Sequence, residues 1–110
     1  MSDVLARLEG VIAARRQALA ADPALAAKSH AAHLLAGGPP LAARKLGEEA
    51  IETVVAALAE DDRRLASEAA DLVFHLLVLL AARGVPLAAV FAELARREGG
   101  AGTRTKEEPG

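Results

Sequence analysis

The sequence predicts an all-α fold, a small helical bundle of four to five helices, and three observations support this prediction. The chain contains 28 Ala and 17 Leu but only eight Val and two Ile, a composition typical of helices rather than strands. Apolar residues recur at intervals of three and four along most of its 110 residues, as they do on one face of a helix. Glycine and proline gather at a few positions that suit helix ends. A β-sandwich or barrel is therefore excluded.

Two helices are expected in the first third of the chain. Ser2 is a suitable N-cap for the first. The apolar residues of this helix, at helical spacing, are Val4, Leu5, Leu8, Val11, Ile12 and Leu19. Asp22 and Pro23 form an N-cap followed by proline at the first helical position. A short second helix is expected from there to the Gly-Gly-Pro-Pro stop at residues 37–40.

Three more helices are expected in the rest of the chain. The third covers residues 40–59 and the fourth residues 63–83, with the charged turn at residues 60–62 between them. Gly84 suits the C-cap of the fourth helix. Pro86 opens a fifth helix, which ends near residue 97.

These elements are interpreted as one all-α domain over residues 1–97. The tail at residues 98–110 has no large apolar side chain and cannot offset the entropy of becoming ordered, so it is expected to be disordered. The chain has 30 apolar side chains larger than alanine, which is a small core for a chain that buries only a modest part of its surface alone. A homo-oligomer, most simply a homodimer, is therefore expected.

The composition also excludes several classes of function. A net charge of −2 gives no basic field to hold the phosphates of a nucleic acid. The absence of cysteine excludes disulfides, thiolate zinc sites and a cysteine nucleophile, and makes the cytoplasm the expected location. The N-terminus lacks the pattern of a signal peptide, and the most apolar run, residues 72–82, is too short to cross a bilayer. Neither a nucleic acid nor a membrane is expected as a partner.

Acidic residues are unevenly placed on the third and fourth predicted helices. On the third helix, with Lys45 in the same stripe, three acids share an arc of about 100 degrees: Glu48, Glu49 and Glu52. On the fourth, an otherwise apolar segment carries three polar residues within about 60 degrees: Glu68, Asp71 and His75. One interpretation is a solvated surface with ion pairs to Lys45 or Arg44. The other is a set of oxygen ligands for Mg²⁺ or Mn²⁺, ions that bind together with substrate phosphates.

Other centres fit the sequence less well. A di-iron carboxylate bundle needs Glu-x-x-His on each of two helices, and the sequence lacks this motif. His30 and His33 are three residues apart, but no cysteine and no obvious third ligand accompany them as a zinc site requires. The chain has neither a P-loop nor a Gly-x-Gly-x-x-Gly turn. Phosphates are therefore expected to be held by a metal ion and by Lys or Arg side chains.

The acidic segments match a known sequence pattern. Residues 45–52 read Lys-Leu-Gly-Glu-Glu-Ala-Ile-Glu, and residues 68–80 begin Glu-Ala-Ala-Asp-Leu-Val-Phe-His and continue as a Leu-rich run. With the Arg-Gly-Val at residues 83–85, these segments resemble the phosphoribosyl-ATP pyrophosphatase family, a branch of the MazG-like all-α nucleotide pyrophosphatases. The superfamily pattern, Glu-x-x-Glu followed by Glu-x-x-Asp, is matched by Glu49 with Glu52 and by Glu68 with Asp71.

The resemblance extends over residues 4–97 and implies a reaction. It implies Mg²⁺-dependent hydrolysis of phosphoribosyl-ATP to phosphoribosyl-AMP and pyrophosphate, the second step of histidine biosynthesis, by an assembly of two or more chains. The metal ligands it implies, for Mg²⁺ or alternatively Mn²⁺, are Glu49, Glu52, Glu68 and Asp71. Glu48 or Glu49 is the expected catalytic residue, orienting the attacking water as a general base.

Three further residues are expected to contact the substrate. Lys45 suits a phosphate, and it equally suits an intrahelical ion pair with Glu48 or Glu49. His75 either contacts the substrate or completes the polar stripe of its helix. Ser29 is suggested by family position, because residues 29–31, Ser-His-Ala, stand where the family usually has Ser-Tyr-Thr; otherwise Ser29 is a helix-surface serine.

Two alternative functions stay open. The first is a housekeeping pyrophosphatase of the same superfamily that acts on non-standard or deoxynucleoside triphosphates, with the same metal chemistry and a different base pocket. Besides histidine, Phe74 and Phe91 are the only rings available to stack on a base, and both also suit a core. The second is a non-catalytic helical interaction module whose acids are merely solvated. Binding of a divalent ion distinguishes this module from both enzymes.

Overall fold

The computed structural model describes residues 3–100, which form an all-α bundle without a strand. In chain order the elements are α1 (Asp3–Ala21), the 3₁₀ turn η1 (Pro23–Ala27), α2 (His30–Ala36), α3 (Gly38–Ala59), α4 (Asp62–Arg83), α5 (Leu87–Arg96) and the 3₁₀ turn η2 (Glu98–Gly100). The predicted fold class is confirmed. The proposed cap at Ser2 and residues 101–110 of the predicted tail lie outside the described residues.

The second predicted helix is interrupted, so the prediction of one continuous helix from Pro23 is wrong. Pro23–Ala27 form only the turn η1. Ser29 is extended, with φ −132° and ψ 128°, and its Oγ accepts a hydrogen bond from the backbone N–H of Ala32 at 3.2 Å. Serine is favoured at an N-cap, where its hydroxyl accepts a backbone hydrogen bond, and is less favourable inside a helix. Helix α2 therefore begins anew after Ser29.

The other helix ends lie within two residues of their predicted positions. Asp61 caps α4, and its Oδ1 accepts a hydrogen bond from the backbone N–H of Arg64 at 2.9 Å. Gly38 and Gly84 both have φ +72°, a left-handed conformation that glycine adopts without a Cβ penalty. Gly84 thereby ends α4 as its C-cap. Gly38 lets α3 start directly after α2, with the two prolines in its first turn.

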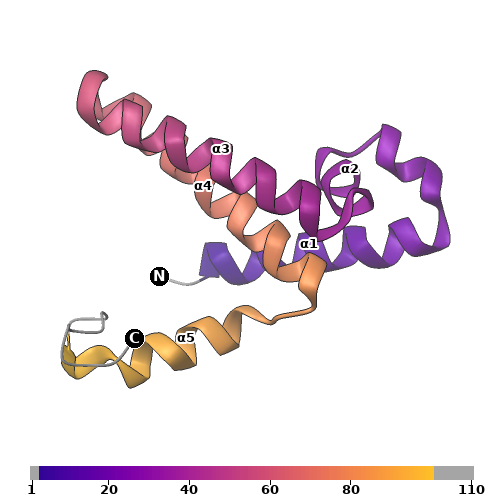
Figure 1. The fold of residues 1–110 in the computed structure, drawn as a ribbon. Helices are drawn as coiled ribbons and strands as arrows, with labels where there is room; N and C mark the ends of the chain where they lie inside the picture. Colours follow the sequence, from indigo (N-terminus) through magenta and orange to yellow (C-terminus); the bar gives the residue numbers. More distant parts are fainter. Residues whose placement is uncertain (1–2, 101–110) are drawn as a thin grey trace.

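The core lies where α1 and α2 meet the adjoining ends of α3 and α4 (Figure 1). Its buried residues are Ile12, Leu34, Leu35, Ala42, Leu77, Val78 and Leu87. Helices α3 and α4 form an antiparallel hairpin whose far end projects beyond this core (Figure 1). Helix α5 leaves the core in a different direction, and its start is fixed where the N–H of Leu87 donates to Glu9 Oε2 at 2.7 Å.

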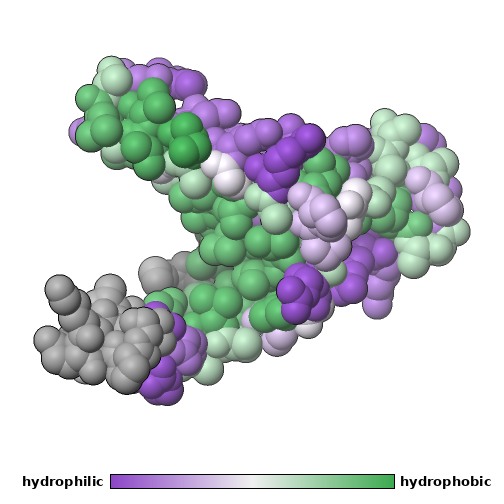
Figure 2. All heavy atoms as spheres, in the orientation of Figure 1, coloured by the Kyte–Doolittle hydropathy of each residue, from purple (hydrophilic) through white to green (hydrophobic). Residues whose placement is uncertain are grey.

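Large apolar side chains remain exposed on the hairpin and on α5. Leu58 is 83% exposed and Ile51 is 66% exposed. The other members of this exposed set on α3, α4 and α5 are Val54, Val55, Val73, Leu76, Phe91 and Leu94. Figure 2 shows apolar surface at the tip of the hairpin and along the hollow between the hairpin and α5. Contiguous exposed apolar surface of this kind is typical of interaction sites.

Candidate metal centre

The candidate site lies between the two helices of the hairpin. Because α3 and α4 run antiparallel, Glu49 in the middle of α3 lies opposite Glu68 and Asp71 in the first half of α4. Thr53 marks the close approach of the helices: its Oγ1 lies 2.8 Å from the carbonyl oxygen of Glu49 and 3.2 Å from that of Glu68. The hydroxyl has one hydrogen, which it donates to one of these oxygens at a time, and its position marks the register at which the acids of the two helices come together.

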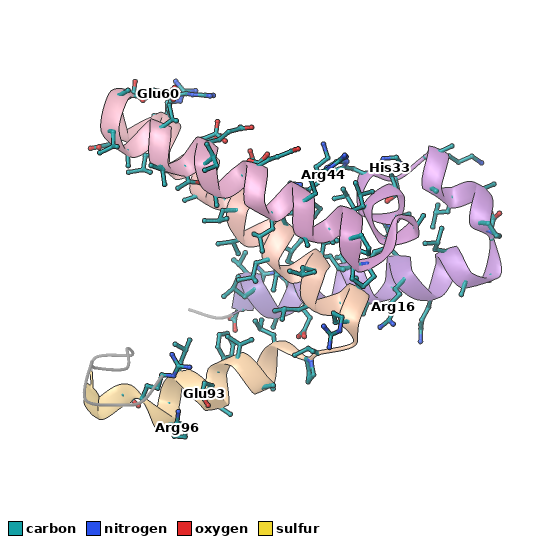
Figure 3. All side chains as sticks on the ribbon, viewed as in Figure 1. Arg16, His33, Arg44, Glu60, Glu93 and Arg96 are labelled. Atoms are coloured by element: carbon teal, nitrogen blue, oxygen red, sulfur yellow. The ribbon has the colours of Figure 1, made fainter. Side chains whose placement is uncertain are left out.

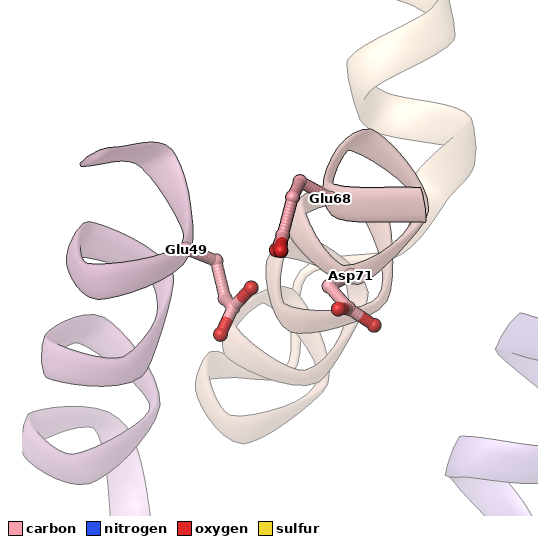
Figure 4. A group of neighbouring side chains, drawn as sticks. All are labelled: Glu49, Glu68 and Asp71. Atoms are coloured by element: carbon pink, nitrogen blue, oxygen red, sulfur yellow. The ribbon is translucent and has the colours of Figure 1, made fainter. Parts of the chain in front are cut away.

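Three carboxylates converge at this point. Glu49, Glu68 and Asp71 each offer one oxygen, and these oxygens all lie within 4.8 Å of one another. Figure 4 shows the Glu49 side chain reaching from α3 toward the acids of α4. Glu68 is buried, Glu49 is half-buried and Asp71 is exposed. The group therefore spans the distance from the helix interface to solvent.

The surroundings of Glu68 disfavour its negative charge. Burial raises the pKa of the Glu68 carboxyl, the neighbouring charge of Glu52 raises it further, and Glu49 adds to the rise. Arg64 acts in the opposite direction and lowers this pKa through an ion pair, with its Nη2 2.8 Å from Glu68 Oε2. Crowded carboxylates raise each other's pKa in this way. The net electrostatic requirement at the site is for positive charge.

The donor set fits a divalent cation. Glu49 Oε1 and Glu68 Oε1 are buried oxygens that have no hydrogen-bond partner, and a buried carboxylate oxygen without a donor or cation is costly. These two atoms come from opposite helices, and Asp71 adds a solvent-facing ligand. A set of carboxylate oxygens is the chemistry that Mg²⁺ and Mn²⁺ prefer. The predicted ligand Glu52 is exposed, and it lies close enough to Glu68 to raise that residue's pKa.

Three predicted site residues of α3 lie outside the convergent group: Glu52, described above, and the pair Glu48 and Lys45. Glu48 is exposed, and its Oε2 lies 3.8 Å from Arg44 Nε while its Oε1 lies 3.6 Å from Lys45 Nζ. Lys45 thus forms the intrahelical ion pair that the sequence offered as the alternative to phosphate binding. Figure 3 labels Arg44 on the part of α3 nearer the core, well away from Glu60 at the hairpin tip.

The two other predicted substrate contacts have structural roles in the described chain. Ser29 caps α2, as described above. His75 is only 7% exposed, and its Nδ1 lies 2.7 Å from the backbone oxygen of Asp71. Because a carbonyl oxygen only accepts, Nδ1 carries the proton and donates. The His75 ring also packs edge-on against Phe74, at 5.2 Å between ring centroids. A role for either residue in substrate binding stays a prediction.

Sequence reasoning missed Arg64 and Thr53. Arg64 lies four residues before Glu68 and Thr53 four residues after Glu49, so each is one helical turn from an acid of the group. That spacing is a usable signal for the ion pair. The contact of Thr53 with α4 depends on the register of the hairpin, which no pattern in one helix specifies.

Two other features of the structure involve helix α4. A hollow of about 270 Å³ lies between α1 and the end of α4, and its lining includes Glu9, Arg16 and Gly84 but none of the three convergent acids. Helix α4 is long and apolar enough to cross a bilayer by length and composition alone, which the short apolar run in the sequence did not indicate. Within the described structure it packs against α3, and it carries Glu68 and Asp71 in its first half and His75 just past its middle.

The fold and the site together define an all-α protein with a candidate divalent-cation centre between two antiparallel helices. Residues 7–98 of this protein match the phosphoribosyl-ATP pyrophosphohydrolase family. The chain belongs to this family, which confirms the resemblance that the acidic motifs indicated.

Relatives of this chain carry the name phosphoribosyl-ATP pyrophosphatase. The one from Rhizorhabdus wittichii is 57% identical over 106 residues, covering 96% of this chain and 94% of the relative. The one from Erythrobacter litoralis is 55% identical over 108 residues, or 98% of both chains. The relative from Novosphingobium aromaticivorans is 54% identical over 104 residues, covering 94% of this chain and 92% of its own length.

Proposed function

We propose that this protein hydrolyses phosphoribosyl-ATP to phosphoribosyl-AMP and pyrophosphate, the second step of histidine biosynthesis. The observation that carries the proposal is the convergence of Glu49, Glu68 and Asp71 from two helices in a chain of this family. In this reaction a water oxygen bonds to the α-phosphorus, the bond from that phosphorus to the β-phosphate oxygen breaks, and the water gives up its protons. Pyrophosphate is the leaving group.

Four acids are proposed to hold the metal ion that this reaction requires. Glu49, Glu68 and Asp71 supply the convergent oxygens, and Glu52 stands beside them on α3. A bound Mg²⁺, or Mn²⁺, neutralises phosphate charge and polarises the phosphorus toward attack. The buried, partnerless oxygens of Glu49 and Glu68 support this assignment. Asp71 faces solvent, the direction from which a charged triphosphate approaches.

A glutamate of α3 is proposed as the general base that takes the proton of the attacking water. The expected candidates are Glu48 and Glu49, and the geometry favours Glu49, because it lies within the convergent group while Glu48 is occupied by Arg44 and Lys45. A base must lie within hydrogen-bond reach of the water it orients. Lys45, whose Nζ pairs with Glu48, is proposed to contact a substrate phosphate through its ammonium group.

We further propose that two chains associate as a homodimer through the exposed apolar side chains of the hairpin and α5. The proposed partner is a second copy of this chain. In a dimer with two-fold symmetry the same surface of each chain packs against that of the other, so the exposed apolar side chains would cover one another. Replacing Leu58 and Ile51 by Glu tests this, with sedimentation velocity as the measurement. A dimer for the wild type and a folded monomer for the double variant are expected. A wild type that stays monomeric at high concentration contradicts the proposal.

The proposed location is the cytoplasm, and a nucleotide is the proposed partner rather than a nucleic acid or a membrane. The net charge of −2 gives no basic field for a polynucleotide. The side chains of Glu68, Asp71 and His75 on α4 would be costly to place in a bilayer.

A housekeeping triphosphate pyrophosphatase and a non-catalytic interaction module are the alternative functions. Neither has an observation in its favour that the main proposal lacks.

The experiment is pyrophosphate release from phosphoribosyl-ATP, with and without Mg²⁺, beside ordinary and modified nucleoside triphosphates. Mg²⁺-dependent release from phosphoribosyl-ATP, lost in Asp71→Asn, is expected. Asp62→Asn is the matched control, because Asp62 lies on the same helix, is exposed and lies outside the convergent group. Faster release from another triphosphate moves the function to the housekeeping alternative. No release from any substrate overturns the enzyme proposal.

A further inference from the structure

Arg64 is the one cation that forms an ion pair with a convergent acid within the described residues. Its Nη2 lies 2.8 Å from Glu68 Oε2, and the Glu68 side chain in this pair is only 9% exposed. The arginine itself is 57% exposed. The positive charge thus enters from the solvent side and compensates the most buried carboxylate of the site.

A second contact anchors the same guanidinium. Arg64 Nε donates to Oε1 of Glu60 at 3.2 Å, and Glu60, the C-cap residue of α3, lies four residues before Arg64 while Glu68 lies four residues after it. The guanidinium of arginine is always charged in proteins. A guanidinium presents five N–H donors in a fixed plane. Glu60 therefore holds Nε in place while Nη2 is able to change its partner.

Arg64 and a metal ion would compete for the negative charge of one carboxylate, that of Glu68. Its Oε1 is buried without a partner, and its Oε2 is bound by Arg64. A divalent cation on Glu68 repels a guanidinium at 2.8 Å from the same carboxylate, since both are positive. The phosphates that such a cation brings to the site carry the negative charge that a displaced Nη2 requires.

Resting on the function proposed above, we propose that Arg64 is a phosphate-positioning residue that exchanges partners. In the metal-free protein it neutralises Glu68 in place of the cation. When the cation takes Glu68, Arg64 turns its Nη2 to the β- and γ-phosphates of the substrate and then to the pyrophosphate product. The arginine thereby opposes metal binding alone and favours metal binding together with polyphosphate.

The test compares Arg64→Gln with the wild type in two titrations. With Mn²⁺ alone, followed calorimetrically, the variant is expected to bind about three- to fivefold more tightly, because a half-exposed ion pair no longer competes. With pyrophosphate in the presence of saturating Mn²⁺, it is expected to bind about tenfold more weakly, because a charge-assisted hydrogen bond is lost. These opposite changes are not expected of a residue that only stabilises the helix.

Two further variants serve as controls. Arg63→Gln makes the same change in net charge one residue away, and Arg63 is not among the ion pairs of the described chain; both affinities are expected to stay within about twofold. Arg64→Lys retains the charge and is expected to restore part of the pyrophosphate affinity.

The outcomes separate this inference from the proposed function. If the wild type binds no Mn²⁺, the metal centre itself is wrong and both proposals fail. If the wild type binds Mn²⁺ but Arg64→Gln binds it no more tightly, or binds pyrophosphate equally well, only the exchange by Arg64 is overturned. Equal changes in Arg63→Gln show a general charge effect and overturn it as well.

Discussion

Two glutamates of this protein each pair with arginine one helical turn away, and their carboxyls respond in opposite directions. On α5, Glu93 pairs with Arg96 and with Arg97, whose Nε lies 2.7 Å away, and these contacts lower the pKa of Glu93 to about 2 (Figure 3). On α4, Glu68 pairs with Arg64, yet its pKa is raised. Burial and two neighbouring carboxylates outweigh one arginine at Glu68. On α5 the arginines fully compensate the charge of Glu93. In the hairpin the single Arg64 does not compensate the charges around Glu68, so this site still lacks positive charge.

The largest expected effect of this difference is on turnover. Glu68→Gln and Asp71→Asn should each lower Mg²⁺-dependent hydrolysis of phosphoribosyl-ATP by more than about a hundredfold. Mutation of a residue that only hydrogen-bonds to a metal ligand already lowers activity by up to about a hundredfold, and loss of a ligand itself should cost more. Glu93→Gln should stay within about threefold of the wild type. Steady-state kinetics measure both. Equal losses in the α4 and α5 variants would mean that the two pairs are alike.

The second effect is on thermal stability in the presence of metal. Mg²⁺ at a hundredfold excess over its dissociation constant adds about 2.7 kcal/mol to the folded state, so a rise in Tm on the order of 10 °C is expected for a domain of this size. Glu49→Gln should fold normally, because removing one crowded carboxylate relieves repulsion, and its Tm should respond little to Mg²⁺. Differential scanning calorimetry provides the comparison. A full response in Glu49→Gln contradicts the ligand assignment.

The smallest effect is on the pH dependence of stability without metal. The folded-state pKa of Glu93 is below its usual value, so its contribution is present above about pH 4.5 and is lost as the pH falls toward 2. The folded-state pKa of Glu68 is raised, so its contribution is present at low pH and is lost as the pH rises through that value. Against the wild type, Glu93→Gln should remove an acid-side loss of stability and Glu68→Gln a loss on the neutral side. Chemical denaturation across pH 2–7 measures the free energy of unfolding of each variant relative to the wild type. If this difference changed with pH in the same direction for both variants, the comparison would be contradicted.

The sequence predicted the helices well because their signals are local. Gly84 and Asp61 end and begin α4 through contacts within a few residues, and both were visible as cap residues or turns. The division of the second predicted helix was missed, because proline after Asp22 is a strong local start signal and the extended Ser29 competes with it only weakly. Helix periodicity therefore predicted that helices form in these segments, but it did not predict where a helix is interrupted.

The sequence predicted the three acids that converge together with Glu52, which lies outside the convergent group, and it did not predict how these side chains are arranged. Glu49, Glu68 and Asp71 were all candidate ligands, because their spacing places them on one face of each helix. Glu48, one residue from Glu49, turns to Arg44 and Lys45 instead, and that choice depends on how α3 rotates against α4. The partner exchange at Arg64 is likewise visible only once Glu68 is known to be buried.

The central claim is that the hairpin acids form a divalent-metal centre, and anomalous scattering from crystals soaked in Mn²⁺ tests it most directly. The account predicts a single strong peak, or a close pair of peaks, within coordination distance of Glu49, Glu68 and Asp71, with Arg64 moved away from Glu68. Crystals of Asp71→Asn should show this peak weakened. A manganese peak only at other acids would contradict the account, whereas Glu68 still paired with Arg64 at saturating Mn²⁺ would overturn only the exchange by Arg64.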